Sequence, residues 1–156
     1  MWPETREKTE LEIGQLRDLF AHYRNLLEKV RDSAPETIEV SALGSFLHSF
    51  YTGVENIFKR IATEVDRAGP SGERWHAELL VAVSQPRPHR AAVISPHLKL
   101  ALVEYLEFRH MFRHAYDHLL RWSRMNGLVL NAEEVLNRLE AELRSFFSGD
   151  APDEAT

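Results

Sequence analysis

The chain has 156 residues, of which 44% are hydrophobic and 28% charged, a balance typical of one globular domain. Its 19 basic and 24 acidic side chains give a formal net charge of −5, which excludes a uniformly basic nucleic-acid coat protein. Cysteine is absent, which excludes disulfides, thiolate metal sites and cysteine nucleophiles, and no apolar run approaches the roughly 18 residues of a membrane span.

Apolar residues at helical spacing predict two long helices in the first half of the chain. The first is predicted over 4–33, and its single apolar stripe consists of Ile13, Leu16, Phe20, Tyr23, Leu27 and Val30. The second is predicted over 35–67, and its broader stripe indicates a central position in the fold. This helix contains Gly44 and Gly53. Because a glycine costs a helix about 1 kcal/mol, we expect both to allow close approach by a neighbouring helix.

Two further helices are predicted in the middle of the chain. A shorter one is predicted over 73–84, with three apolar residues on one side. Ser95 and Pro96 then mark a helix start, because a capping hydroxyl is followed by proline at the first helical position. This fourth helix is predicted to reach about Trp122.

The last helix is predicted to follow a turn at 126–127, where Asn precedes Gly. Asn131 and Glu134 resemble a capping box at its start, and Gly149 ends it. Its apolar stripe consists of Leu136, Leu139, Leu143 and Phe147.

No segment alternates between apolar and polar residues as a half-buried strand does. The sequence therefore predicts an all-α, antiparallel bundle of four to five helices. We expect one domain over 1–149 and an acidic, disordered tail over 150–156. Because cysteine and an apolar N-terminal stretch are both absent, a reducing cytoplasm is the expected compartment.

The basic residues are unevenly distributed along the chain. The window 87–124 holds seven Lys or Arg against three Asp or Glu, so its net charge is +4, whereas the rest of the chain carries −9. Five of the eight histidines also lie in this window. Such a segment can hold a phosphate-bearing ligand while the remaining surface repels it. The alternative is a helix face that is merely solvated.

The fourth predicted helix carries the candidate chemistry. On a helical wheel Arg109 lies at the border of the core face, and burying an unpaired guanidinium is costly. A purely structural alternative for Arg109 is therefore an ion pair across the bundle, with Glu55 as the candidate partner. The polar face consists of His110, Arg113, His114, Asp117 and His118. On the same wheel Tyr116 lies about 20 degrees from Arg109, whereas His114 lies about 140 degrees away.

The histidines of this polar face admit two interpretations. His110, His114 and His118 are four residues apart, a spacing that can hold a metal, although such rows are more commonly surface residues. We therefore predict no metal and no cofactor. Imidazole titrates near neutrality and guanidinium binds phosphate oxygens, so the set suits RNA cleavage with the 2′-OH as nucleophile. Three histidines that stand alone in their helices are predicted to be structural or surface residues: His22, His48 and His76.

The stretch 108–116 resembles the Arg-x4-His-x-Tyr motif of HepT-like toxins, which belong to the HEPN superfamily of small helical proteins. The three motif residues are matched by Arg109, His114 and Tyr116. His110 occupies a position where HepT proteins usually have asparagine. The segment 46–62 also resembles the central helix of a HepT-like subgroup, and the resemblance covers about 36–147.

The resemblance implies a metal-independent endoribonuclease toxin that works as a homodimer. In this hypothesis one His114 takes the proton of the 2′-OH, and the second His114 protonates the leaving 5′-oxygen. Arg109 stabilises the transition state, and the product is a 2′,3′-cyclic phosphate. The residues expected to support phosphate binding are His110, Arg113 and Tyr116. The wheel angle between Arg109 and His114 agrees with a site shared across a twofold axis, although a kink near His114 is a competing solution.

Related HepT toxins are paired with a minimal nucleotidyltransferase antitoxin that attaches AMP to the motif tyrosine. The resemblance therefore implies that Tyr116 is the AMP acceptor. The expected partners are an RNA substrate, a second copy of the chain and a cognate nucleotidyltransferase, with no membrane. Two other classes of function remain open: a HEPN module that binds RNA or a nucleotide without catalysis, and a structural or regulatory dimer subunit.

Overall fold

The computed structural model describes residues 1–149, without the side chain of Asp117, and the tail predicted over 150–156 lies outside the described residues. This part of the chain is all-helical, as predicted, and contains no strand. Its elements in chain order are α1 (Pro3–His22), α2 (Arg24–Lys29), α3 (Thr37–Glu64), α4 (Trp75–Val83), α5 (Pro96–His114), the short 3₁₀ helix η1 (Asp117–Leu119) and α6 (Trp122–Ser148). Within residues 1–149, every helix is too short or too polar to cross a membrane.

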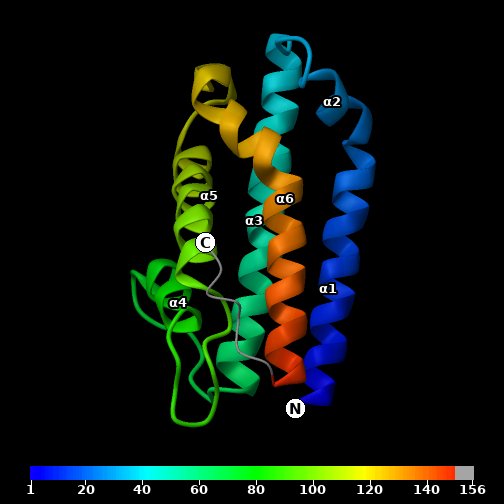
Figure 1. Cartoon of the computed structure of the whole chain (residues 1–156). Helices are drawn as coiled ribbons and strands as arrows, with labels where there is room; N and C mark the ends of the chain where they lie inside the picture. The colour runs from blue at the N-terminus through cyan, green and yellow to red at the C-terminus, as the bar shows by residue number, and fades with distance from the viewer. Residues whose placement is uncertain (150–156) are drawn as a thin grey trace.

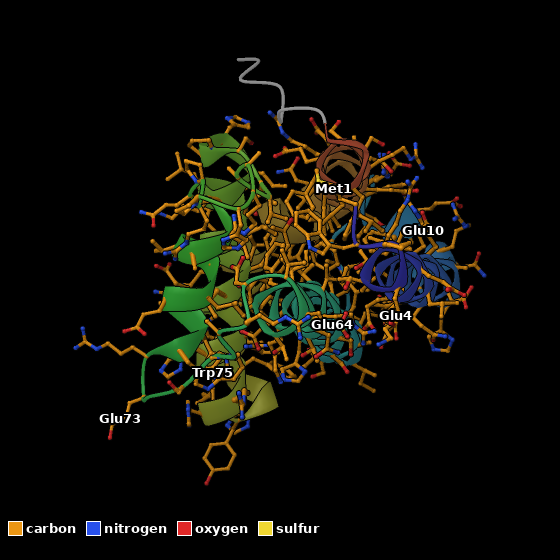
Figure 2. All side chains as sticks on the ribbon, turned by 90° about the horizontal axis from the view of Figure 1, so that it is seen from below. Met1, Glu4, Glu10, Glu64, Glu73 and Trp75 are labelled. Atoms are coloured by element: carbon orange, nitrogen blue, oxygen red, sulfur yellow. The ribbon has the colours of Figure 1, made fainter. Side chains whose placement is uncertain are left out.

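The long helices α1, α3, α5 and α6 lie side by side and alternate in direction along the chain (Figure 1). The central helix, α3, contacts α1, α4, α5 and α6. Seen from below, Glu4 and Trp75 lie on opposite sides of the end of α3, so α1 and α4 flank this helix (Figure 2). The N-terminal amine of Met1 donates to the carbonyl oxygen of Phe147 at 3.3 Å, which places the start of α1 beside the end of α6.

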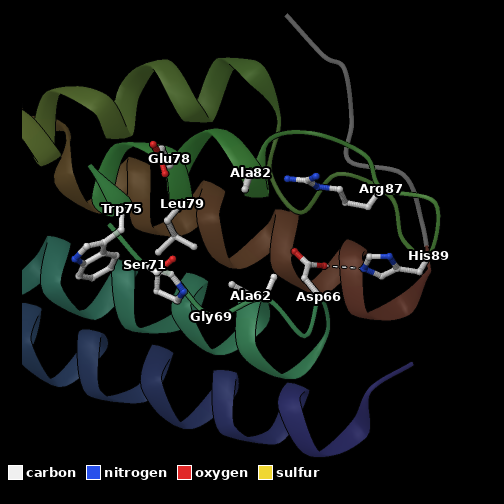
Figure 3. Close-up of a pocket in the computed structure, with 12 residues that line it drawn as sticks. Ala62, Asp66, Gly69, Ser71, Trp75, Glu78, Leu79, Ala82, Arg87 and His89 are labelled. Atoms are coloured by element: carbon white, nitrogen blue, oxygen red, sulfur yellow. Dashed lines mark hydrogen bonds and ion pairs between the residues drawn. The ribbon is translucent and has the colours of Figure 1, made fainter. Parts of the chain in front are cut away.

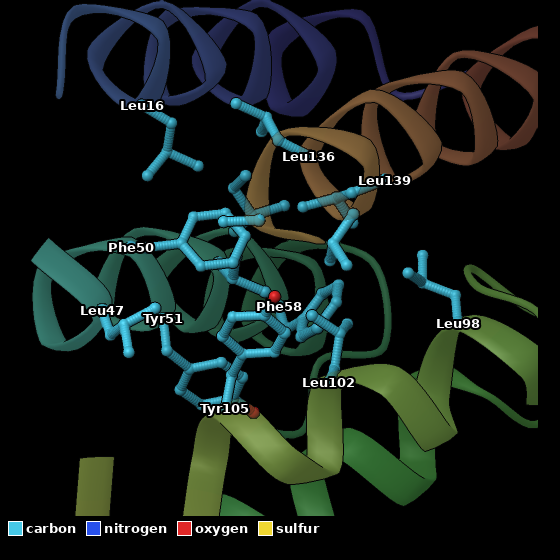
Figure 4. Packing of buried hydrophobic residues seen from close by; sticks show 14 of the residues in the cluster. Leu16, Leu47, Phe50, Tyr51, Phe58, Leu98, Leu102, Tyr105, Leu136 and Leu139 are labelled. Carbon is cyan, nitrogen blue, oxygen red and sulfur yellow. The ribbon is translucent and has the colours of Figure 1, made fainter. Parts of the chain in front are cut away.

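The core lies between α3 and its long neighbours. Phe50 and Phe58 of α3, Leu102 of α5 and Leu139 of α6 are all buried and gather in this space (Figure 4). The ring of Phe50 also meets the ring of Tyr105 on α5 edge to face, with centroids 5.2 Å apart. Aromatic side chains bury large areas, so this part of α3 fixes the position of α5 along the bundle.

Both glycines of α3 allow a neighbour to approach closely, as expected. A Cβ atom at Gly44 would lie 2.8 Å from the side chain of Leu120 and 2.9 Å from that of Phe112. A Cβ atom at Gly53 would overlap the side chain of Leu16 on α1. Real Cβ atoms do not approach other heavy atoms so closely, so a side chain at Gly44 or Gly53 would force the neighbouring side chains to shift.

The prediction of a single helix over 4–33 is wrong, because the structure divides this segment into two helices. α1 ends at His22 and α2 begins at Arg24, with Tyr23 between them in a non-helical conformation (φ −95°, ψ 4°). The ring of Tyr23 packs against Phe46 with centroids 5.3 Å apart. Val30 is nevertheless buried, so the apolar stripe continues past the break and keeps the segment on the core.

α5 begins where the sequence predicts but ends earlier. The Ser95 Oγ accepts a hydrogen bond from the backbone N–H three residues later, at 3.1 Å, which confirms the predicted cap. Glu142 of α6 accepts hydrogen bonds from the backbone N–H and the hydroxyl of Ser95, so the start of α5 is fixed to α6. The helix ends at His114, because Ala115 is extended (φ −117°, ψ 153°), and the prediction that it reaches about Trp122 is wrong.

α6 begins earlier than predicted. It runs from Trp122 through the turn expected at 126–127 and through the start expected at Asn131. Met125 and Val129 are buried and extend the apolar stripe of the later part of the helix. Burial of these side chains therefore outweighs the turn preference of the Asn–Gly pair. The predicted end is confirmed, since α6 stops before a glycine in the left-handed conformation (φ 84°).

Candidate functional site

Arg109 lies in the second half of α5 with its side chain turned into the bundle, and only 4% of the residue is exposed. Its Nη2 atom lies 2.8 Å from each carboxylate oxygen of Glu55 on α3, so the ion pair considered for these residues is present. The guanidinium carbon also lies 4.9 Å from the ring centroid of Tyr51, and Nη1 donates a long hydrogen bond to Thr52. A buried charge is tolerated when it is paired and hydrogen-bonded in this way.

His76 on α4 joins the same pair, and we call Glu55, His76 and Arg109 the Arg109 cluster. The Nδ1 atom of His76 lies 2.7 Å from Oε2 of Glu55 and 3.0 Å from Nη2 of Arg109. The indole of Trp75 stacks on the imidazole, with centroids 3.6 Å apart. The sequence indicated only a structural or surface role for His76. No local pattern connects it with residues that are 21 and 33 positions away, and only the packing of α4 brings them together.

A pocket of about 320 Å³ lies beside the Arg109 cluster, between α5 and the start of α4. Its ionisable lining residues are Glu73, Arg74, His76, Glu107, Arg109, His110 and Arg113. The motif arginine therefore shares one pocket with His110 and Arg113, whereas Tyr116, also expected to support phosphate binding, does not line it. Three guanidiniums face two carboxylates there. Because Arg109 is already paired with Glu55, the two remaining guanidiniums balance the two carboxylates, and Arg74 and Arg113 are the groups that can bind a phosphate.

His114 lies outside this pocket, as the last residue of α5, and is exposed. Its ring contacts the ring of His110 at an angle of 65°, with centroids 4.9 Å apart. Because His110 lines the pocket, the two imidazoles connect the pocket with the end of α5. The chain is helical from Arg109 to His114, so these two motif residues point to different faces of one helix.

Tyr116 is not beside Arg109, which corrects the position expected from the wheel. The wheel assumed a helix at this point, whereas Tyr116 lies beyond the end of α5 and is 75% exposed. Its ring stacks on His118, with centroids 5.7 Å apart. The row of three histidines is broken for the same reason, since His118 lies in η1. In the described part of the chain, no group of three His, Cys, Asp or Glu side chains could hold a metal ion.

His48 of α3 lies at the other edge of the site, where its ring contacts that of Phe112 with centroids 5.4 Å apart. Burial, and then the charges of Arg109 and Arg113, lower the pKa of His48. The neutral imidazole is therefore favoured there, and the positive potential of α5 extends to this part of α3.

A second pocket, of about 290 Å³, lies between α4 and the loops on either side of it (Figure 3). Asp66 accepts hydrogen bonds there from His89 at 2.8 Å and from the buried Arg90 at 2.6 and 2.7 Å. Although burial raises it, these hydrogen bonds lower the pKa of Asp66 overall. Arg90 also donates to backbone carbonyls of the loop. These charged groups bind one another, so we assign the cluster a structural role.

The comparisons with known proteins show to which family the chain belongs. A family model described as HepT-like protein matches residues 42–149, which is well over half of the chain and includes the whole of α4, α5 and α6. Neither the curated proteins nor the solved structures gave a significant match.

Proposed function

The chain belongs to the HepT-like protein family, and from this premise we propose that it is a metal-independent endoribonuclease toxin that works as a homodimer. The observation that carries the proposal is the pocket beside the Arg109 cluster. It collects the motif arginine with His110 and Arg113, and His110 contacts the motif histidine, His114. Guanidinium and imidazole are the groups that phosphodiester cleavage by a 2′-OH requires.

The proposed reaction begins with attack of the ribose 2′-oxygen on the neighbouring phosphorus, which forms a 2′,3′-cyclic phosphate and releases the 5′-oxygen. One His114 accepts the proton of the 2′-OH, and His114 of the second copy supplies a proton to the leaving oxygen. Arg109 stabilises the charge that develops on the phosphate. Arg113 and His110 hold the phosphate in the pocket.

A second copy is part of the proposal because Arg109 and His114 of one chain cannot both face the same phosphate. Arg109 is buried against α3, whereas His114 is exposed at the end of the helix. Two copies that meet along the exposed end of α5 would bring His114 of one to the pocket of the other. Met111 and Leu119 are 43% and 53% exposed near this end and would lie at such a contact.

The test is RNA cleavage in the presence of EDTA, with His114→Ala as the variant. We expect the wild type to cut RNA and the variant to be slower by about 10²-fold or more, the usual contribution of a general acid or base. Mapping of the 3′ ends should show cyclic phosphate. The proposal is wrong if the wild type cuts none of a broad set of RNAs, or if His114→Ala cuts equally well.

We further propose that a cognate minimal nucleotidyltransferase attaches AMP to Tyr116. The hydroxyl oxygen of Tyr116 would bond to the α-phosphorus of ATP, with release of pyrophosphate. The support from the structure is exposure, since Tyr116 lies outside the helix and is 75% accessible. Intact-mass spectrometry after co-expression with a minimal nucleotidyltransferase of the type that HepT toxins pair with should show a gain of one AMP. Modification that persists in Tyr116→Phe would contradict the assignment.

One observation favours a second candidate function, an RNA- or nucleotide-binding module without catalysis. Arg109 is already neutralised by Glu55 within its own chain and is almost fully buried. An arginine in this state can support a pocket without acting on a ligand. The cleavage test separates the two functions, because a binding module would retain RNA in the pocket and release it uncut.

A further inference from the structure

We infer that His76 is the general base of the pocket and that Glu55 fixes its tautomer, an inference that rests on the proposed ribonuclease function. His76 replaces the His114 that the proposed reaction uses as the base, so each site needs only one His114, which acts as the acid. His76 lines the same pocket as Arg109, whereas His114 does not. The base is therefore supplied by the protomer that supplies the arginine.

The contacts of His76 determine where its proton lies. Nδ1 is 2.7 Å from a carboxylate oxygen of Glu55, which can only accept a hydrogen bond. We therefore assign the hydrogen to Nδ1, which donates it to Glu55. The contact of Nδ1 with Nη2 of Arg109, at 3.0 Å, would need the opposite tautomer, because a guanidinium only donates, and the shorter distance to the carboxylate favours the hydrogen on Nδ1. In the neutral ring the free electron pair is then on Nε2.

The remaining surroundings leave Nε2 available to a ligand. Trp75 covers one face of the imidazole, and Lys59 lies 5.2 Å above the indole, so the ring is held in place. The side chain of His76 is 30% exposed, and Nδ1 is its one hydrogen-bonding atom with a partner in the described residues. A histidine oriented by a carboxylate, with its second nitrogen open to a pocket, is the usual arrangement of a general base.

Glu55 thus has two functions in this inference. It neutralises Arg109 when no ligand is bound, and it stabilises the imidazolium of His76 after the proton has moved. The 2′-OH gives its proton to Nε2 of His76 as the 2′-oxygen bonds to phosphorus. The bond between phosphorus and the 5′-oxygen breaks, and the 5′-oxygen takes a proton from His114 of the second copy. His76 then returns its proton to water, and a proton from water restores His114.

The variant His76→Asn tests this role with little structural change. The amide nitrogen of asparagine occupies the place of Nδ1 and can still donate to Glu55, whereas Nε2 is lost. We expect RNA cleavage to be slower by about 10²-fold or more, with an unchanged melting temperature. The matched control is His97→Asn, at an exposed histidine near the start of α5, and should cut at the wild-type rate.

A second substrate separates the base from the acid. In RNA with a bridging sulfur in place of the 5′-oxygen, the leaving thiolate needs no proton. On this substrate His76→Asn should remain impaired by the same factor, whereas His114→Ala should regain most of the wild-type rate. If the sulfur restores His76→Asn instead, His76 is the acid and the inference is wrong.

The outcomes distinguish this inference from the proposed function. If the wild type cuts RNA and His76→Asn cuts equally well, the ribonuclease stands and His76 is only structural. If the wild type cuts no RNA, the proposed function fails and the inference fails with it.

A measurement that needs no variant is the ¹⁵N spectrum of the imidazoles. A neutral His76 with its hydrogen on Nε2 would overturn the inference.

Discussion

An equimolar mixture of Arg109→Lys and His114→Ala proteins should cut RNA far faster than either protein alone. The cleavage rate of each variant alone should fall by about 10²-fold. Arg109→Lys lacks the planar guanidinium that stabilises charge on the phosphate, and His114→Ala lacks the general acid. Arg109→Lys is chosen because lysine keeps a positive charge opposite Glu55. In the mixture half of the dimers contain one chain of each kind. With His76 as the base, each site needs His114 of one copy only, so one of the two sites in such a dimer is intact. The expected rate is therefore about one quarter of the wild-type rate.

The structural reason is the separation of the two motif residues on α5. Arg109 is enclosed by α3 and α4, and His114 is exposed at the helix end, so a complete site draws them from different copies. The two proteins should be co-expressed with different tags, so that mixed dimers can be isolated and assayed. The control pairs Arg109→Lys with the double variant Arg109→Lys and His114→Ala, which leaves no intact site and should stay inactive. A mixture without recovered activity would rule out a shared site that uses one His114, because only a site within one chain, or one that needs His114 of both copies, would then fit.

The parts of the fold that the sequence predicts correctly depend on interactions between residues close together in the chain, or on the cost of burying an unpaired charge. The cap at Ser95 needs only a hydroxyl, a proline and the following helix, all adjacent in the chain. The stripe that contains Leu136 and Leu139 repeats at helical spacing, and both residues are buried. The pairing of Arg109 with Glu55 follows from the high cost of an unpaired charge on a core-facing position.

The errors come from contacts between distant parts of the chain. Nothing near Ala115 in the sequence breaks a helix, yet α5 stops there and Leu120 packs against the surface that Gly44 leaves open on α3. The Asn–Gly pair at 126–127 is a strong turn signal, but burial of Met125 keeps it helical. His76 is the error with the greatest consequence for the site, because its two partners lie on other helices.

Glu55→Ala should be the most destabilising change at the site, with a loss of about 3–5 kcal/mol in the free energy of unfolding. The reason is the environment of Arg109, which is 4% exposed and would be left as a buried charge without its carboxylate. Urea unfolding followed by circular dichroism at one protein concentration measures this loss. The matched control is Glu10→Ala, which removes an exposed pair with Arg6 and should cost less than about 1 kcal/mol.

Replacing both members of the buried pair gives the opposite expectation. Glu55→Met combined with Arg109→Met leaves no buried charge, so most of the stability lost in Glu55→Ala should return. If Glu55→Ala is instead no less stable than Glu10→Ala, the Arg109 guanidinium is hydrated or paired with another anion, and the ion pair contributes little to the stability of the fold. The doubly substituted protein also separates structure from chemistry. If it folds but does not cut RNA, then at least one of Arg109 and Glu55 is required for the reaction itself, since the bundle forms without them.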